Sequence, residues 1–121
     1  MAWKRVNVRT IPDTDADSDW HADGGVIFEK MSREVSAYIK TNYDDTGKRT
    51  SFSVSSGDDE YQNNPSGTIR VVVWEFISIF RDEASRNEFV EDSIIHTEGM
   101  RRNAVNAAKG IVKKVTVDEE V

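Results

Sequence analysis

The chain of 121 residues contains neither cysteine nor leucine. Without cysteine it can form no disulfide, no thiolate metal site and no cysteine nucleophile, and its redox compartment is left open. The missing leucine is unusual, because leucine is normally among the commonest residues and a good helix former. Fourteen valines and nine isoleucines supply the aliphatic side chains instead. A core of β-branched residues favours a sheet.

Long hydrophobic segments are absent as well. The longest apolar run covers residues 69–80 and holds nine aliphatic or aromatic residues, well short of the roughly 20 that span a membrane. The N-terminus lacks the hydrophobic stretch of a secretory signal. We therefore expect a cytoplasmic protein, or a component of a virion, with no membrane partner.

The chain has fewer cations than acids, 16 lysines and arginines against 22 aspartates and glutamates, and its formal net charge is −6. Binding to nucleic acid or to an anionic membrane needs a positive field, so the composition argues against a nucleic-acid partner. A chain of this length fits a single domain, residues 1–121, that buries roughly two thirds of the surface of its unfolded form.

Catalytic signatures are missing too. The chain has no nucleophile elbow, no dinucleotide-binding glycine pattern and no P-loop. His96 is followed by Glu98 at a spacing that separates the two side chains on a helix, so they make no metal pair. Glu75 interrupts the apolar run, and burial there would raise its pKa and make it a candidate general acid. No second catalytic group accompanies it, so we predict a non-enzymatic protein with no cofactor and no metal.

Residues 11–23 contain five aspartates and no lysine or arginine. An EF-hand calcium loop needs glycine at its sixth position and glutamate at its twelfth. Loops that begin at Asp13, Asp15 or Asp17 all fail this requirement. The segment is therefore predicted to be a solvated acidic loop, and a cation site of another kind is the alternative.

The apolar run is expected to form the central strand, residues 68–80. Both of its faces are apolar, which predicts a strand that is covered on both sides. The serine-rich residues 49–56 are its expected antiparallel partner, and the polar residues 57–67 between them are expected to form a mobile loop. Because the partner is much shorter, the central strand must bend, bulge or meet another element.

A helix is predicted over residues 24–41, where apolar side chains recur at helical spacing and Asp23 can serve as N-cap. A long second helix is predicted over residues 83–109. Residues 85–88 have the Ser-x-x-Glu pattern of a capping box at its start. Gly99 should weaken or bend this helix without dividing it.

Short strands complete the expected fold. One is centred on Val6 and Val8, and another covers residues 111–117 after Gly110, which suits the left-handed position that ends a helix. Residues 118–121 should form a short acidic tail. The predicted class is α+β, with a mostly antiparallel sheet of about four strands packed against one helix in the N-terminal half and one long C-terminal helix.

Charge is segregated along the chain. Residues 100–117 carry five lysines and arginines and no acid, the reverse of residues 11–23. In a monomer these would be two solvated patches or a weak internal pair. In an assembly they could meet head to tail between copies, as heterologous contacts that form rings or filaments. The predicted contact residues, which include an aromatic face of the central strand, are Trp74, Glu75, Phe76, Phe80, Asp13, Asp15, Asp17, Asp19, Arg101, Arg102, Lys113 and Lys114.

No motif identifies a family. The order of helix, hairpin, helix and final strand resembles that of small subunits at phage tail and head–tail junctions, and the resemblance rests on this order alone. It implies a structural or interaction protein, a subunit of a homomeric assembly whose partners are other protein subunits. The alternative is a small acidic binding module, an inhibitor or regulator that docks on a basic protein.

Overall fold

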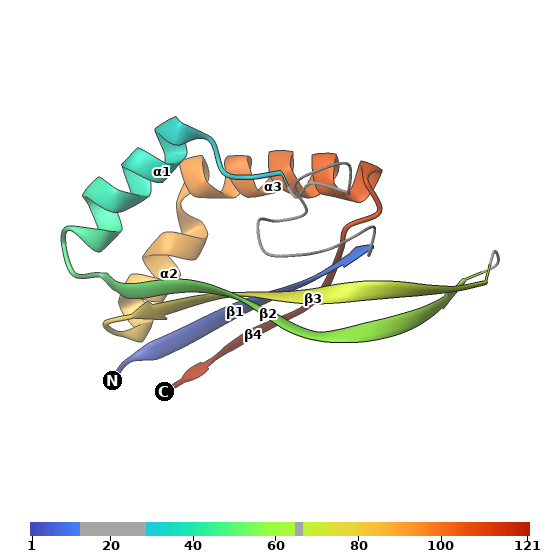
Figure 1. Cartoon of the computed structure of the whole chain (residues 1–121). Coiled ribbons are helices and arrows are strands. Elements are labelled where there is room, and N and C mark those ends of the chain that lie inside the picture. Colours follow the sequence, from blue (N-terminus) through green and yellow to red (C-terminus); the bar gives the residue numbers. More distant parts are fainter. Residues whose placement is uncertain (13–28, 65–66) are drawn as a thin grey trace.

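The computed structural model describes residues 1–12, 29–64 and 67–121. In these residues a four-stranded antiparallel sheet lies against a layer of helices (Figure 1), which confirms the predicted α+β class. The sheet has the order β2-β3-β1-β4. Its strands are β1 (Trp3–Pro12), β2 (Arg49–Asn64), β3 (Gly67–Phe80) and β4 (Val112–Glu120). The helices are α1 (Arg33–Ile39), the π-helical turn η1 (Lys40–Asp44), α2 (Glu83–Glu91) and α3 (Ser93–Ala108).

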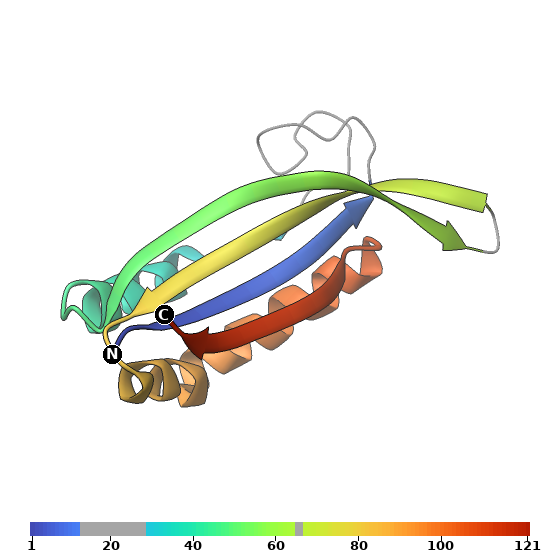
Figure 2. The same ribbon diagram turned by 90° about the horizontal axis from the view of Figure 1, so that it is seen from below.

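The two faces of the sheet have different surroundings. Arg5 lies opposite Ser78 in the register of β1 and β3, and residues directly opposite each other share a face. Phe80 lies on this face and contacts Phe89 of α2, with ring centroids 5.1 Å apart. Ile77 points to the other face, and in Figure 2 none of the described helices lies over it. Val6 and Val73 of this second face are nevertheless buried, so the expectation of a central strand covered on both sides stays a prediction.

The hairpin of β2 and β3 is much longer than predicted. Residues 57–64 continue β2, and the two strands stay paired from Asp59 opposite Val72 to Asn64 opposite Gly67. The prediction of a mobile loop over residues 57–67 is wrong over this range. A polar composition indicates that a segment is exposed to solvent, but it does not exclude a strand. Here the backbone groups of β3 provide hydrogen-bonding partners for the backbone of β2. The mismatch that was expected to bend the central strand is absent, because β2 pairs along the whole of β3, and two irregularities in the register accommodate the extra residues of β2.

The first helix starts later than predicted. Residues 29–32 are not helical, and α1 begins at Arg33 after Ser32, whose hydroxyl accepts a hydrogen bond from the Val35 N–H at 3.3 Å. Residues 24–28 and the predicted cap Asp23 lie outside the described residues. Apolar residues recur at helical spacing before residue 33, but residues 29–32 form no helix. Backbone N–H groups in this segment donate to side chains of α3 instead of to a preceding helical turn.

The second helix is divided, and the prediction of one continuous helix over residues 83–109 is wrong. The break is at Asp92, whose ψ of 118° is extended, while Gly99 lies inside α3. The Asp92 carboxylate accepts from the N–H groups of Ile94 and Ile95, so it caps α3. Asp82 caps α2 by accepting from the Ser85 N–H at 2.8 Å, which replaces the predicted capping box.

The end of α3 follows the prediction. Gly110 has a φ of 82°, and its N–H donates to Ala107 O while Ile111 N–H donates to Asn106 O. This is the Schellman arrangement, in which glycine takes the left-handed position. The strand that follows runs to Glu120, so the predicted acidic tail of residues 118–121 is largely part of β4.

One cluster of the apolar core lies at the end of the sheet near the two chain termini and α2 (Figure 1), and Trp74 and Ile111 are buried elsewhere. Ile39, Tyr43 and Ile95 are buried together and join α1, η1 and α3. Phe89 packs edge-on against Tyr43 with ring centroids 5.0 Å apart, and it also contacts the fully buried Phe80. Aromatic contacts at this spacing and tilt add to the free energy gained by burying their area.

Two glycines in and beside α3 provide a matched test of this description. Gly110→Ala should lower the free energy of unfolding by about 1 kcal/mol or more, because alanine is strained at positive φ. Gly99→Ala should raise it by up to about 1 kcal/mol, because a Cβ there meets no atom within 4 Å and alanine favours a helix. Urea denaturation of both variants measures the difference, and equal effects would contradict the assigned helix end.

Candidate functional site

A cavity of about 440 Å³ lies between the sheet and the helices. Its apolar wall combines side chains from the sheet, α1, α2 and α3: Ile39, Phe52, Phe76, Phe89 and Ile95. Phe52 is 50% exposed, which places it at the rim. The cavity therefore has an apolar interior and an opening to solvent beside β2.

The polar part of the cavity is strongly cationic. Arg5, Arg9, Lys30, Arg49 and Arg102 all line it, and no aspartate or glutamate is among the described lining residues. The whole chain has a net charge of −6, so this is a local reversal of the overall charge. Such a concentration of cations inside a concave site attracts anions.

Two of these arginines have carboxylate partners in the same chain. Arg5 pairs with Asp118, a β4 carboxylate that also accepts from Arg86 at 2.9 Å. Arg49 pairs with Asp44 through its Nε at 2.7 Å and a second guanidinium nitrogen at 2.9 Å. These two arginines are therefore neutralised by side chains that lie outside the cavity.

Arg9 and Arg102 have no carboxylate partner among the described residues. Arg9 donates through Nη2 to Asn103 Oδ1 at 3.0 Å, but its Nη1 and the Nε of Arg102 are buried without a hydrogen-bond partner in the described part of the chain. Burial, and then the neighbouring charge of Arg102, lower the pKa of Arg9. Burial also lowers the pKa of Arg102. Both guanidinium groups still stay charged at neutral pH.

The local positive potential extends beyond the cavity wall to Lys113 of β4. Burial lowers the pKa of Lys113, followed by repulsion from Arg9 and Arg5. Three cations on neighbouring strands thus act on one another, with one carboxylate, Asp118, beside Arg5. Among the described residues, the positive charges around Arg9 therefore outnumber the negative ones.

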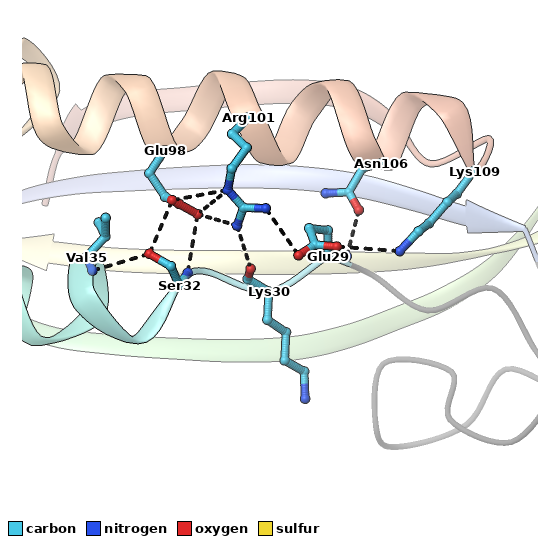
Figure 3. Close-up of polar contacts among 8 residues, drawn as sticks. All are labelled: Glu29, Lys30, Ser32, Val35, Glu98, Arg101, Asn106 and Lys109. Carbon is cyan, nitrogen blue, oxygen red and sulfur yellow. Dashed lines mark hydrogen bonds and ion pairs between the residues drawn. The ribbon is translucent and has the colours of Figure 1, made fainter.

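A polar network joins α3 to residues 29–32, the segment before α1 (Figure 3). Glu98 of α3 is only 6% exposed, and its carboxylate accepts from the Ser32 N–H at 3.2 Å and the Ser32 hydroxyl at 3.3 Å. Arg101 binds both Glu98 and Glu29, and it donates to the carbonyl oxygen of Lys30. The hydrogen bond from Arg101 is the main reason that the pKa of Glu98 is lowered. These contacts fix residues 29–32 along α3.

A second carboxylate joins α1, η1 and the start of α3. Asp92 Oδ2 accepts from the Tyr38 hydroxyl at 2.6 Å and from the Tyr43 hydroxyl at 2.8 Å. Burial alone would raise the pKa of Asp92, but these two bonds and those from Ile95 and Ile94 outweigh it and lower the pKa. Ionised Asp92 is thus stabilised in the folded chain.

Asp92→Asn tests that network through its pH dependence. A lowered carboxylate pKa stabilises the fold above the ordinary value of 3.8, and the contribution is lost as the pH falls through the folded-state pKa. We expect Asp92→Asn to reduce the free energy of unfolding by about 1 kcal/mol at pH 7, since charge-assisted hydrogen bonds are stronger than neutral ones. The deficit should be smaller at about pH 3 than at pH 7, because pH 3 lies below the ordinary pKa and the contribution fades as the pH falls toward the lowered folded-state pKa.

Urea denaturation at both pH values measures this deficit. Glu91→Gln is the matched control, because Glu91 is an exposed carboxylate next to Asp92 in sequence. It should change the stability little at either pH. A deficit for Asp92→Asn that is the same at both pH values would contradict the role of the ionised carboxylate.

The aromatic residues predicted as a contact surface lie mainly inside the chain. Phe80 is fully buried and Trp74 is 6% exposed, while Phe76 lines the cavity. These three side chains point toward the helices, and their predicted role in a contact with another subunit stays a prediction. Glu75 lies on the opposite face of the sheet, half-buried, opposite Val8.

The predicted basic contact residues are divided by the structure. Arg101 is paired with Glu98 and Glu29, and Arg102, next to it in sequence, lines the cavity. Lys113 is exposed on β4. The side chain of Lys114 and the acidic residues Asp13, Asp15, Asp17 and Asp19 lie outside what the structure describes, so complementarity between the two charged segments stays a prediction.

The candidate catalytic residues do not contribute to the described lining of the cavity. Neither Glu75 nor His96 is among the described residues that line the cavity, and His96 is exposed on α3. The described residues contain no group of three or more histidine, aspartate or glutamate side chains that could hold a metal ion. Nor do they contain a helix long and apolar enough to cross a membrane.

Arg9 was not among the functional residues predicted from the sequence. Arg5, Asn7 and Arg9 alternate with valines, and this pattern was interpreted as a strand half exposed to water. In the sheet these three side chains instead face the helices, opposite Ser78 and Phe76 and Trp74 of β3. The signal in the sequence was that polar residues alternate in the first strand as aromatic residues do in the central strand. Only the strand register shows that these two sets of side chains lie opposite each other.

Comparisons of the chain with family models, curated proteins and solved structures found no match.

Proposed function

We propose that the protein is a non-enzymatic subunit of a larger homomeric assembly. The observation that carries this proposal is the outer part of the β2–β3 hairpin. β1 pairs with β3 only from Val71 to Phe80, whereas β2 and β3 stay paired as far as Asn64 and Gly67. Residues 61–64 and 67–70 thus form a two-stranded ribbon that extends beyond the rest of the sheet (Figure 2).

Such a ribbon needs another partner to be stable. An isolated two-stranded hairpin is at best marginally stable in water, and stability requires a third strand or packing against another element. None of the other described strands pairs with either edge of the ribbon, and an unpaired edge can pair with a strand of another chain. A neighbouring copy that supplies a strand or a surface would satisfy both requirements.

The second face of the sheet supports the same proposal. Val6 lies opposite Ile77 on one side and opposite Val117 on the other. Ile77, Val117 and Val8 are half-buried, whereas Val6 and Val73 of the same face are buried, and none of the described helices packs over this face. An apolar sheet face of this kind is a typical surface for contacts between subunits.

The order of the elements remains similar to that of phage tail and head–tail subunits, and a virion assembly is the specific form of the proposal. The alternative of an acidic inhibitor or regulator depends on residues 13–19, which lie outside the described residues. An acidic inhibitor or regulator would have no use for the ribbon, whereas an assembly would use it as a contact. The assembly is therefore the function that the described geometry supports best.

Deletion of the ribbon tests the proposal. A variant in which Asn-Gly joins Glu60 directly to Val71 removes residues 61–70 and leaves the pairing of β1 with β3 intact, and this dipeptide suits a two-residue hairpin turn. We expect the full chain to have a solution mass several-fold that of the 13.7 kDa chain. The deletion variant should have the mass of a monomer by light scattering, with an unchanged circular dichroism spectrum.

A control variant keeps the ribbon at full length and carries the same Asn-Gly pair at positions 65 and 66, as Pro65→Asn with Ser66→Gly. It should assemble like the unaltered chain. A strict monomer at every concentration and salt concentration for the full chain would count against an assembly. An undiminished mass for the deletion variant would show instead that the contact lies elsewhere, with the second sheet face as the next surface to test.

A further inference from the structure

We propose that the cavity between the sheet and the helices binds a small organic anion. Its acidic group would lie between Arg9 and Arg102, and its apolar body would contact Phe52, Phe76 and Phe89. The site is separate from the ribbon and from the second sheet face, so the inference does not depend on the proposed assembly.

The main argument is that each of two half-buried guanidinium groups has a buried nitrogen without a hydrogen-bond partner in the described part of the chain. Arg9 Nη1 and Arg102 Nε are buried without a hydrogen-bond partner among the described residues, and neither side chain forms an ion pair there. Buried charges in native proteins are normally paired. A lysine or histidine could lose its proton to escape this cost, but a guanidinium group cannot. An anion in the cavity would supply the missing acceptor.

The chemistry of the two arginines indicates the kind of acidic group. A guanidinium presents several donors in one plane, which matches the oxygens of a carboxylate or a phosphate. Arg9 holds one side of its guanidinium toward Asn103, so its orientation is set before a ligand arrives. Arg5 and Arg49 already bind Asp118 and Asp44, which leaves Arg9 and Arg102 as the pair for the ligand.

The size and walls of the cavity indicate a ligand larger than an inorganic ion. A volume of about 440 Å³ falls within the roughly 300–1,000 Å³ of small-molecule sites. Three phenylalanines line it, from β2, β3 and α2. Phe52, Lys30 and Ser36 are exposed at its border, which gives a ligand a route from solvent. A bare phosphate would leave most of this apolar wall unused.

The inference also predicts an unusual effect on stability. A structural arginine that is replaced by methionine normally lowers the melting temperature, because its partners lose their hydrogen bonds. Arg102 has no such partner in the described residues, so Arg102→Met should leave the melting temperature of the unliganded protein unchanged or raise it. The same variant should lose ligand binding, as expected for a residue kept for function at a cost in stability.

Titration calorimetry and thermal shift with three probes provide the test. Phenyl phosphate carries both the charge and the ring, inorganic phosphate only the charge, and benzyl alcohol only the ring. We expect phenyl phosphate to bind and to raise the melting temperature, and each of the other probes to bind at least about tenfold more weakly. Arg9→Met and Arg102→Met should each weaken phenyl phosphate binding by about tenfold or more.

Arg101→Met is the matched control. It removes the same charge from the neighbouring position of α3, but Arg101 binds Glu98 and Glu29 and does not line the cavity. This variant should lower the melting temperature and keep phenyl phosphate affinity within about twofold. The two substitutions therefore have opposite effects on stability and on binding.

Three results would overturn the proposal. The first is that the full chain binds none of the probes. The second is that Arg102→Met and Arg101→Met weaken phenyl phosphate binding equally, which would indicate general charge attraction. The third is that a peptide of residues 11–23 binds in a way that depends on Arg102 while phenyl phosphate does not bind, which would assign the cavity to the acidic segment of this chain.

Discussion

The structure depends on the position of β3 between two antiparallel partners. From Val71 to Phe80, β1 pairs with one side of β3 and β2 with the other, so its backbone groups are satisfied within the sheet. Because side chains alternate along a strand, this register decides that Phe76 and Phe80 face the helices and that Ile77 faces away. A shift by one residue would exchange the two sets. The core, the cavity wall and the second face all follow from this pairing.

Carboxylates position the helices on the sheet. Asp82 and Asp92 cap α2 and α3, Asp92 also binds two tyrosines, and Glu98 holds the segment before α1. The chain has no leucine. One cluster of buried apolar residues, Ile39, Tyr43 and Ile95, joins α1, η1 and α3, and two of its members, Ile39 and Ile95, also line the cavity. The cavity thus lies between this cluster and the arginines of β1.

The net charge of the whole chain is negative, whereas the lining of the cavity is positively charged. A net charge of −6 argues against anionic partners when it is averaged over the surface, but the described lining of the cavity contains five cations and no acid. A ligand experiences the nearby charges, because more distant ones are screened by salt. The assembly surfaces and the cavity occupy different parts of the fold, so one protein could be both a subunit and a receptor for a small anion.

Local patterns in the sequence determined a substantial part of the fold. The α+β class, the long central strand, its antiparallel partner and the left-handed Gly110 were predicted correctly, because periodicity and glycine conformation act over a few residues. Tertiary structure decided the start of α1, the break at Asp92 and the full length of β2. In each case a backbone group found a partner that its own segment could not supply, as when Ser32 N–H donates to Glu98.

The candidate site was decided almost entirely by tertiary structure. Arg9 and Asn103, which hydrogen-bond in the cavity wall, are 94 residues apart, and no local pattern relates them. The sequence by itself determined that arginines alternate with valines in the first strand and that Arg101 and Arg102 are adjacent. Only the strand register and the packing of α3 decided that Arg9 and Arg102 line one cavity while Arg101 binds Glu98, because the burial and pairing of a charge depend on neighbours that are distant in sequence.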